Sequence, residues 1–248
     1  MTKHLLLLAL ALPFHSFAGE PSDSVIGTDD RVQITTSTKN RNDLYNKIGH
    51  LISDTGQCTG TLISSKIVLT AAHCIFDNKT KTLMKPSTLT FYPGRKKSTD
   101  IPFGSFKGRR ILTYKEYTLS QDQDYDVALI ELATDLKLGF LEISESFDHF
   151  ELPKHTLYIS GYAGDKEFAT LWESKGKGAS RDYWSNTLSY KLDTYGGQSG
   201  SAIRAKVGDK FKVIGVHTNG GKYSNSGVRF NAEVFAKVKE WMKMMSPK

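Results

Sequence analysis

The sequence predicts an all-β fold of antiparallel strands, arranged as barrels or as a sandwich, with one helix at its C-terminal end. Many short runs of β-branched and aromatic residues follow one another, and glycine, asparagine, aspartate and proline separate them. Nothing resembles the strand–helix alternation of a parallel sheet. The expected strands lie at residues 48–52, 66–70, 89–92, 126–132, 157–160, 211–217 and 227–230.

The last segment predicts the helix. Apolar residues recur there at helical spacing, and lysines with one glutamate occupy most of the opposite face. The apolar residues are Val234, Phe235, Val238, Trp241 and Met245. We expect this helix to dock on the β domain rather than to lie on a membrane surface.

The N-terminus has the pattern of a secretory signal peptide over residues 1–18. Lys3 and His4 precede an apolar run at residues 5–12, and small side chains at positions 16 and 18 suit a signal peptidase. This run is too short to span a bilayer. We therefore expect secretion to the medium or the periplasm, a pro-segment at residues 19–23 and no membrane partner after signal removal.

The composition is that of a soluble globular protein, with 39% hydrophobic and 24% charged residues and a net charge of +7. The basic residues are scattered, and we expect their densest groups, at 95–97 and 107–110, to be solvated loops. We expect no nucleic-acid partner and a monomer. A binding protein that grips polyanions with this basic surface is the non-enzymatic alternative.

Two cysteines are present, Cys58 and Cys74. In an exported protein the expectation is one disulfide, which would stabilise the fold by about 3 kcal/mol through loop entropy. Two free buried thiols are the alternative. Two cysteines without a nearby histidine pair do not predict a zinc site.

A glycine-rich run, Gly196–Ser201, is the first candidate for chemistry. A serine among glycines gives a tight backbone that can expose one hydroxyl and direct several N–H groups at one point. A nucleophile beside an oxyanion hole needs that arrangement. An ordinary glycine–serine loop is the alternative.

Two further stretches contain partners for such a serine. His73 follows an apolar run and two alanines, and an imidazole is a suitable base for a hydroxyl nucleophile. Asp126 opens the apolar strand expected at 126–132, where a partly buried carboxylate needs a donor such as an imidazole N–H. Taken alone, His73 is as well explained as a structural histidine.

In the order His…Asp…Ser, these three motifs resemble those of the chymotrypsin/trypsin-like serine proteases. The closer resemblance is to the bacterial glutamyl endopeptidases, the acid-specific branch of that superfamily, and it covers essentially the whole mature chain. The stretches that carry it are Ser24–Arg31, Ile159–Lys166, Asp193–Ser201 and His217–Gly220.

The resemblance implies two antiparallel six-stranded β-barrels with a catalytic cleft between them. The first barrel would span 24–140, and 141–248 would hold the second barrel and the C-terminal helix. The activity implied is hydrolysis of polypeptide substrates through an acyl-enzyme. No cofactor and no metal are expected, since no acidic cluster has the spacing of a calcium loop.

The resemblance also implies the role of each catalytic residue. Ser199 would be the nucleophile, His73 the general base and Asp126 the residue that orients the imidazole. Backbone N–H groups of Gly197 and Ser199 would form the oxyanion hole. Ser201 is the rival nucleophile, and we interpret it as structural.

Specificity for glutamate would come from Thr194 and His217, which match residues that recognise an acidic side chain in the glutamyl endopeptidases. A hydroxyl and an imidazole can both donate to a carboxylate, the imidazole more strongly when protonated. A core histidine is the alternative for His217. Asp193 conflicts with glutamate, because trypsin-like enzymes place an aspartate in this register to bind Arg or Lys. We expect Asp193 to turn away from the substrate.

Activation should also differ from that of trypsin-like zymogens. In those proteins a new N-terminal ammonium pairs with an aspartate directly before the nucleophilic serine, but here that residue is the uncharged Gln198. The resemblance implies instead that a mature N-terminus at Ser24 or Val25 adds positive charge near the substrate carboxylate. Because Asp23 precedes Ser24, self-processing is a coherent hypothesis.

Overall fold

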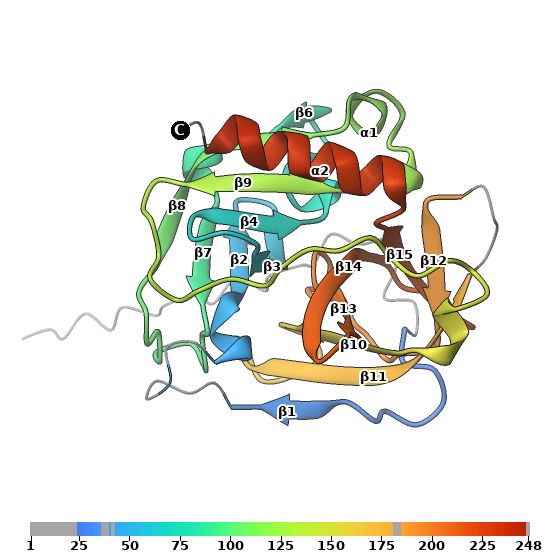
Figure 1. Ribbon diagram of the computed structural model, residues 1–248. Coiled ribbons are helices and arrows are strands. Elements are labelled where there is room, and N and C mark those ends of the chain that lie inside the picture. Colours follow the sequence, from blue (N-terminus) through green and yellow to red (C-terminus); the bar gives the residue numbers. More distant parts are fainter. Residues whose placement is uncertain (1–23, 36–39, 41–42, 181–184, 247–248) are drawn as a thin grey trace, which may run out of the picture.

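The computed structural model describes residues 24–246 except 36–39, 41–42 and 181–184. The expected signal peptide and pro-segment, residues 1–23, lie outside the described residues. Two β-barrels stand side by side, and a long C-terminal helix lies across one of them (Figure 1). The prediction of two antiparallel six-stranded barrels with a C-terminal helix is confirmed.

The first barrel closes in the order β2-β3-β4-β9-β8-β7, and every pairing is antiparallel. Its interior is filled by aliphatic side chains such as Leu69 and Leu129, which no solvent reaches. The strands are β2 (Ile48–Ser53), β3 (Gly56–Leu62), β4 (Ile67–Thr70), β7 (Thr90–Pro93), β8 (Phe106–Thr113) and β9 (Ala128–Leu132).

The second barrel follows the order β11-β10-β13-β14-β15-β12 and closes because β11 also pairs with β12. It has a smaller apolar core that includes Leu157, Ile159 and Ile214. The strands are β10 (Thr156–Gly161), β11 (Leu171–Ser180), β12 (Thr187–Tyr190), β13 (Ala202–Val207), β14 (Lys210–Asn219) and β15 (Asn225–Arg229).

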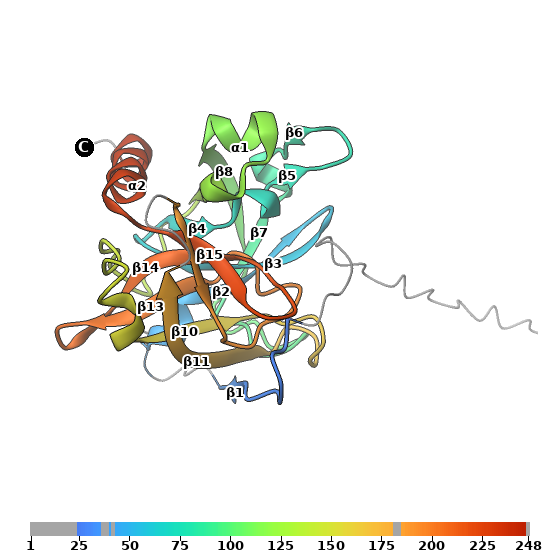
Figure 2. The same ribbon diagram turned by 90° about the vertical axis from the view of Figure 1, so that its right-hand side faces the viewer.

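Smaller elements lie in the connections between strands of the first barrel. A two-stranded sheet pairs β5 (Phe76–Asp77) with β6 (Thr82–Leu83), and a short helix α1 (Lys115–Ser120) follows β8. Both stand above the first barrel in the rotated view (Figure 2). Within the described part of the chain, no helix is both long enough and apolar enough to cross a membrane.

Each end of the described chain packs on the barrel formed by the opposite half of the sequence. Strand β1 (Val32–Ile34) pairs antiparallel with β11 of the second barrel, although residues 24–140 were expected to form the first. Helix α2 (Ala232–Met245) runs alongside β9 of the first barrel (Figure 1). The cause is apolar burial: Val234, Val238, Trp241 and Met245 join the main core cluster, which fills the first barrel and extends to residues of β14 and β15.

Candidate active site

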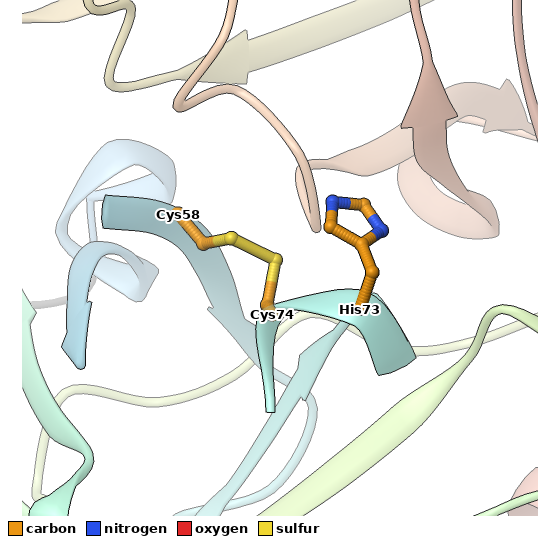
Figure 3. Close-up of side chains that lie close together, drawn as sticks. All are labelled: Cys58, His73 and Cys74. Carbon is orange, nitrogen blue, oxygen red and sulfur yellow. A yellow bond between two sulfur atoms is a disulfide. The ribbon is translucent and has the colours of Figure 1, made fainter. Parts of the chain in front are cut away.

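The histidine turn is set by the end of β4. After Thr70 the chain passes through two alanines without solvent exposure and enters a single 3-10 turn over Ala72–Cys74. The predicted disulfide is confirmed: Cys74 is bonded to Cys58 of β3, with their Cα atoms 6.1 Å apart. Figure 3 shows His73 projecting from the same turn as this disulfide. The crosslink therefore holds the backbone on which the imidazole is mounted.

His73, Cys58 and Cys74 also form a cluster of three groups whose ligand atoms lie within 4.8 Å of one another. A cysteine binds a metal ion through its thiolate. Both sulfurs are committed to the disulfide, and so this cluster offers only the imidazole as a ligand.

Asp126 bonds twice to His73. Its Oδ1 accepts from the His73 backbone N–H at 2.9 Å, and its Oδ2 accepts from the ring Nδ1 at 2.7 Å. The strand begins at Ala128, two residues later than expected, because Asp126 still belongs to the end of a 3-10 turn over Gln123–Tyr125. Thr70, at the end of β4, is paired with Ala128, at the start of β9. Because these strand ends are adjacent, the side chains of His73 and Asp126 lie close together.

The Asp126 carboxylate also controls the charge of His73. Burial alone would lower the pKa of the imidazole, but the charge and hydrogen bond of Asp126 outweigh it, and the pKa is raised above its usual value of 6.5. With Nδ1–H donated to the carboxylate, Nε2 is the nitrogen left to accept a proton. The side chain of His73 is 17% exposed, whereas that of Asp126 is 4% exposed.

The loop that carries Ser199 is pressed against the strands that lead to His73. The Ser199 carbonyl accepts from the backbone N–H of Thr59 in β3 at 2.8 Å. Gly200 has a φ of +83°, and a Cβ there would lie 2.2 Å from Thr70 Oγ1, directly before the histidine turn. Only glycine fits this approach. Three segments distant in sequence, around residues 73, 126 and 199, thus meet at one end of β3, β4 and β9.

Two buried residues of this loop have backbone N–H groups without an acceptor among the described residues, and the half-buried Gly196 has a third such N–H group. Gln198, Gly200 and Ser201 donate their backbone N–H groups to carbonyls of Tyr195, His217 and Gln198, respectively. Among the described residues, no acceptor is found for the N–H groups of Gly197 and Ser199. Since buried donors are nearly always paired, two free ones beside a serine are a place for an anion.

Ser201, the rival nucleophile, is less exposed to solvent than Ser199. It is completely buried, and its hydroxyl lies 2.3 Å from where a Cβ on Gly161 would stand. Ser199 retains 7% exposure. The hydroxyl of Ser201 is therefore packed against Gly161 of β10, near Thr59 of β3, which agrees with its structural interpretation.

Thr194 and His217 are both buried, with exposures of 1% and 3%. Within the described residues the Thr194 hydroxyl has no hydrogen-bond partner. The His217 ring Nδ1 lies 2.6 Å from the Tyr190 hydroxyl, which donates to the Ser226 carbonyl. Burial, with a smaller contribution from the nearby His73, lowers the pKa of His217 to about 3. Without substrate, His217 is therefore neutral.

Asp193 turns to the N-terminal segment. Its Oδ1 accepts from the Ile26 N–H at 2.7 Å and its Oδ2 from the Asp30 N–H at 3.0 Å, with 2% of the residue exposed. The same segment places Ser24 beside Thr194, whose N–H donates to the Ser24 carbonyl at 3.1 Å. Val25, the other expected N-terminal residue, is half-buried.

Three residues of this neighbourhood escaped the sequence prediction. Asn225 is fully buried, and its amide donates to the carbonyls of Ser24 and Leu192, both at 2.7 Å. Tyr190 anchors His217, as described above. Arg31 lies within a stretch quoted for its family resemblance, but one arginine in a polar run carries no signal of its own.

A second buried histidine makes stability depend on pH. His50 is without exposure, stacks on Tyr162 at 4.7 Å between ring centres, and shares a 2.8 Å hydrogen bond through Nε2 with Gln57 Oε1. Burial lowers the pKa of His50 to about 3. His50 and His217 thus remain neutral in the folded state where unfolded histidines are charged.

We expect the free energy of unfolding to fall as the pH decreases from 6.5 toward 3. The unfolded chain binds protons at these two histidines that the folded state does not bind, which costs about 1.4 kcal/mol per pH unit for each. His50→Gln should remove one of the two contributions. Urea unfolding between pH 4 and 6.5 measures the slope for the unmodified protein and for His50→Gln, with a substitution of the half-buried His155, His155→Gln, as control. Equal slopes in all three proteins would contradict the expectation.

Comparison with known proteins gives a consistent result. A protein-family model described as Trypsin matches residues 34–244. The glutamyl endopeptidase of Bacillus licheniformis is 36% identical over 226 residues, which span 88% of this chain and 69% of that protein. The extracellular metalloprotease of Bacillus subtilis is 32% identical over 228 residues, spanning 90% and 70%. A solved Glu endopeptidase in complex with MPD matches with a TM-score of 0.77 and 28% identity, over 88% of this chain and 98% of that one.

Proposed function

Because this chain belongs to the trypsin family and is a serine endopeptidase, we propose that it cleaves polypeptides after glutamate, and more weakly after aspartate. The catalytic residues proposed are Ser199, His73 and Asp126. Support comes from the double hydrogen bond between His73 and Asp126, and from the position of the Ser199 loop on the strands leading to His73.

The acylation step follows from this arrangement. Ser199 Oγ attacks the carbonyl carbon while His73 Nε2 takes the hydroxyl proton, and the Asp126 carboxylate stabilises the imidazolium through Nδ1. The proton then passes to the leaving amine as the peptide bond breaks. Water repeats the sequence on the acyl-enzyme. The negative oxygen formed in each half is bound by the unused N–H groups of Gly197 and Ser199, each worth about 3 kcal/mol.

The observation that carries the choice of glutamate over arginine or lysine is the position of Asp193. Its two oxygens accept from Ile26 and Asp30, so the carboxylate is occupied by the protein's own backbone. The Thr194 hydroxyl, in contrast, is buried and has no partner in the part of the chain that the structure describes. An unsatisfied hydroxyl is costly in the free protein and can be satisfied by a substrate carboxylate.

Positive charge for an acidic side chain must come from a source other than His217, which is neutral in the free protein. We propose the ammonium group released by cleavage before Ser24, since the Ser24 carbonyl is already held by Thr194 and Asn225. His217 would contribute a neutral N–H. The Tyr190 hydroxyl would turn from the Ser226 carbonyl to Nδ1, leaving the ring proton on Nε2 to donate to the substrate.

The test is a panel of otherwise identical peptide amides ending in Glu, Asp, Gln, Arg or Lys, hydrolysed by the processed protein. Glu should give the highest kcat/KM and Asp the second highest, with Arg and Lys barely cleaved. Preference for Arg or Lys would overturn the assignment of Asp193. No turnover of any substrate, together with no labelling by a serine-directed inhibitor, would favour the polyanion-binding alternative.

Gly220 provides a sharper test of the proposed N-terminal charge. A Cβ on Gly220 would lie 2.6 Å from the Ser24 Cβ, so Gly220→Ala should displace the new N-terminus. Losing one charged hydrogen bond should lower kcat/KM for Glu peptides by roughly 10- to 100-fold. Acylation by a nitrophenyl acetate ester, which has no acidic side chain, is the control and should be unaffected. A parallel loss with the ester would show that the substitution damages the catalytic residues instead.

Secretion is part of the same proposal. The signal peptide at residues 1–18 and the pro-segment at 19–23 would be removed, giving a soluble protease that acts as a monomer on polypeptides outside the cell or in the periplasm.

A further inference from the structure

Arg31 is the most completely bonded charged side chain around the Ser199 loop. Its side chain has no solvent exposure. All five guanidinium N–H donors are used: three bonds go to Asp29 and Asp165 through Nε and Nη2, and Nη1 donates to Asp165 and to Gln198. A buried charge with such a bond set holds its partners in a defined geometry.

The partner that matters is Gln198, the residue directly before Ser199. Its Oε1 accepts from Arg31 Nη1 at 3.2 Å and from the Tyr195 backbone N–H at 2.9 Å. The Gln198 N–H in turn donates to the Tyr195 carbonyl at 3.0 Å. The side chain therefore folds back over its own turn, and Arg31 holds it there.

This turn contains the two glycines that give it most freedom. Gly197 has a φ of +96°, and a Cβ there would lie 2.5 Å from the Tyr162 carbonyl oxygen. Glycine can leave such a conformation at little cost, and a rotated Gly196–Gly197 peptide would direct the Gly197 N–H elsewhere. The turn is closed by the Gln198 backbone N–H and by the Gln198 side chain, each of which bonds to Tyr195.

Asp165, another partner of Arg31, lies next to a residue that contacts the same turn. Asp165 follows Gly164, whose N–H donates to the Gly196 carbonyl at 2.7 Å. Arg31 thus ties together both sides of the turn: Gln198 on one side, and the Gly164–Asp165 loop on the other. None of these bonds involves a free N-terminal amine, and the turn is closed in a chain that continues before Ser24.

We propose that Arg31 is a positioning residue that sets the Gly197 and Ser199 N–H groups for oxyanion binding by clamping Gln198. This inference rests on the proposed function, since it assigns those two N–H groups to the transition state. It differs from the Ser24 proposal, because the charge that shapes the turn is on a side chain and does not require cleavage.

The test compares two variants. Arg31→Lys keeps the positive charge but loses the planar guanidinium and its set of hydrogen bonds. Gln198→Met removes the acceptor on Gln198 but keeps the bonds of Arg31 to Asp29 and Asp165. Both should lower kcat roughly 10- to 100-fold with little change in KM, as expected for misplaced transition-state donors. The double variant should lose no more than the worse single variant, because the two residues act in series. Gln198→Met keeps the test valid if Arg31→Lys fails to fold.

Arg204→Lys is the matched control. Arg204 in β13 is also buried and bonds to Glu173 at 2.7 Å, and among the described residues no hydrogen bond joins its side chain to the Ser199 turn. This variant should lower the melting temperature without a selective loss of kcat. Equal losses of kcat in Arg204→Lys and Arg31→Lys would overturn the inference, and so would additive losses in the double variant.

The rate of Ser199 labelling by a neutral organophosphonate separates this inference from the proposed function. The reagent places a developing oxyanion in the same position but has no acidic side chain. Labelling of the unmodified protein, slowed 10- to 100-fold in both variants, supports the inference. Equal rates in all proteins overturn it. Absence of labelling in the unmodified protein overturns the proposed function and the inference together.

Discussion

Ser199→Ala should reduce kcat for a Glu peptide amide by about a million-fold while leaving the fold intact. The substitution removes the atom that would form the acyl-enzyme, and loss of a nucleophilic serine typically has an effect of this size. The new methyl group fits where the Cβ already lies, and so the melting temperature should change little. Hydrolysis of the amide and the melting temperature, measured on the same preparation, check both statements.

Ser201→Ala is the matched control for that experiment. It removes a hydroxyl that is fully buried two residues away, and it should retain most of the activity. The opposite pattern, with Ser199→Ala active and Ser201→Ala inert, would reverse the assignment of the nucleophile. Sequencing the N-terminus of the Ser199→Ala protein also tests maturation, since correct trimming to Ser24 in an inert protein would exclude obligatory self-cleavage.

Asp126→Asn should lower kcat by about ten thousand-fold near neutral pH. The backbone N–H of His73 needs an acceptor at the Oδ1 position, so the asparagine oxygen would lie there and its amide would donate to Nδ1. The ring would then carry its proton on Nε2, which is the wrong tautomer to accept from Ser199. Rates for Glu peptides at pH 7 measure the loss.

The pH profile of the same variant gives an independent readout. The proposed mechanism requires neutral His73, so activity should fall as the pH decreases through the pKa of that imidazole. Asp126 raises this pKa, and its removal should move the acid limb of the residual activity to lower pH. Asp124→Asn is the control, since that carboxylate bonds to Ser185 and Thr187 instead. An acid limb that moves to higher pH would contradict the role given to Asp126.

The catalytic candidates were predictable because each lies in a short contiguous motif whose residue types have a chemical reason to occur together. The strands with strong apolar runs, such as β4, were also predicted within a residue or two. The disulfide followed from two cysteines in a chain whose N-terminal sequence has the pattern of an export signal. Local sequence was sufficient for these features because each needs only local residue types.

Strand β11 escaped prediction because its sequence lacks an apolar alternation, and this has a physical reason. In β11 the inward positions include Gly178, where a Cβ would lie 2.7 Å from Leu157 Cδ1. Its neighbour Lys177 is exposed. The strand therefore makes room for large side chains from other elements instead of contributing its own, and its sequence resembles that of a polar loop.

The N-terminal segment could not be predicted because its contacts are distant in sequence. Arg31 and Gln198 are separated by 167 residues, as are Ile26 and Asp193. No periodicity or spacing encodes such contacts. The orientation of Asp193, on which the choice between an acidic and a basic substrate depends, follows only from these contacts.

The exchange of chain ends between the barrels has a mechanical consequence. The N-terminal strand β1 is fastened to the late half of the chain, and the C-terminal helix α2 is fastened to the early half. Each half of the chain is therefore bound to the other half by its own terminal element. Separating the two halves therefore requires breaking the β1–β11 pairing and removing the apolar residues of α2 from the core.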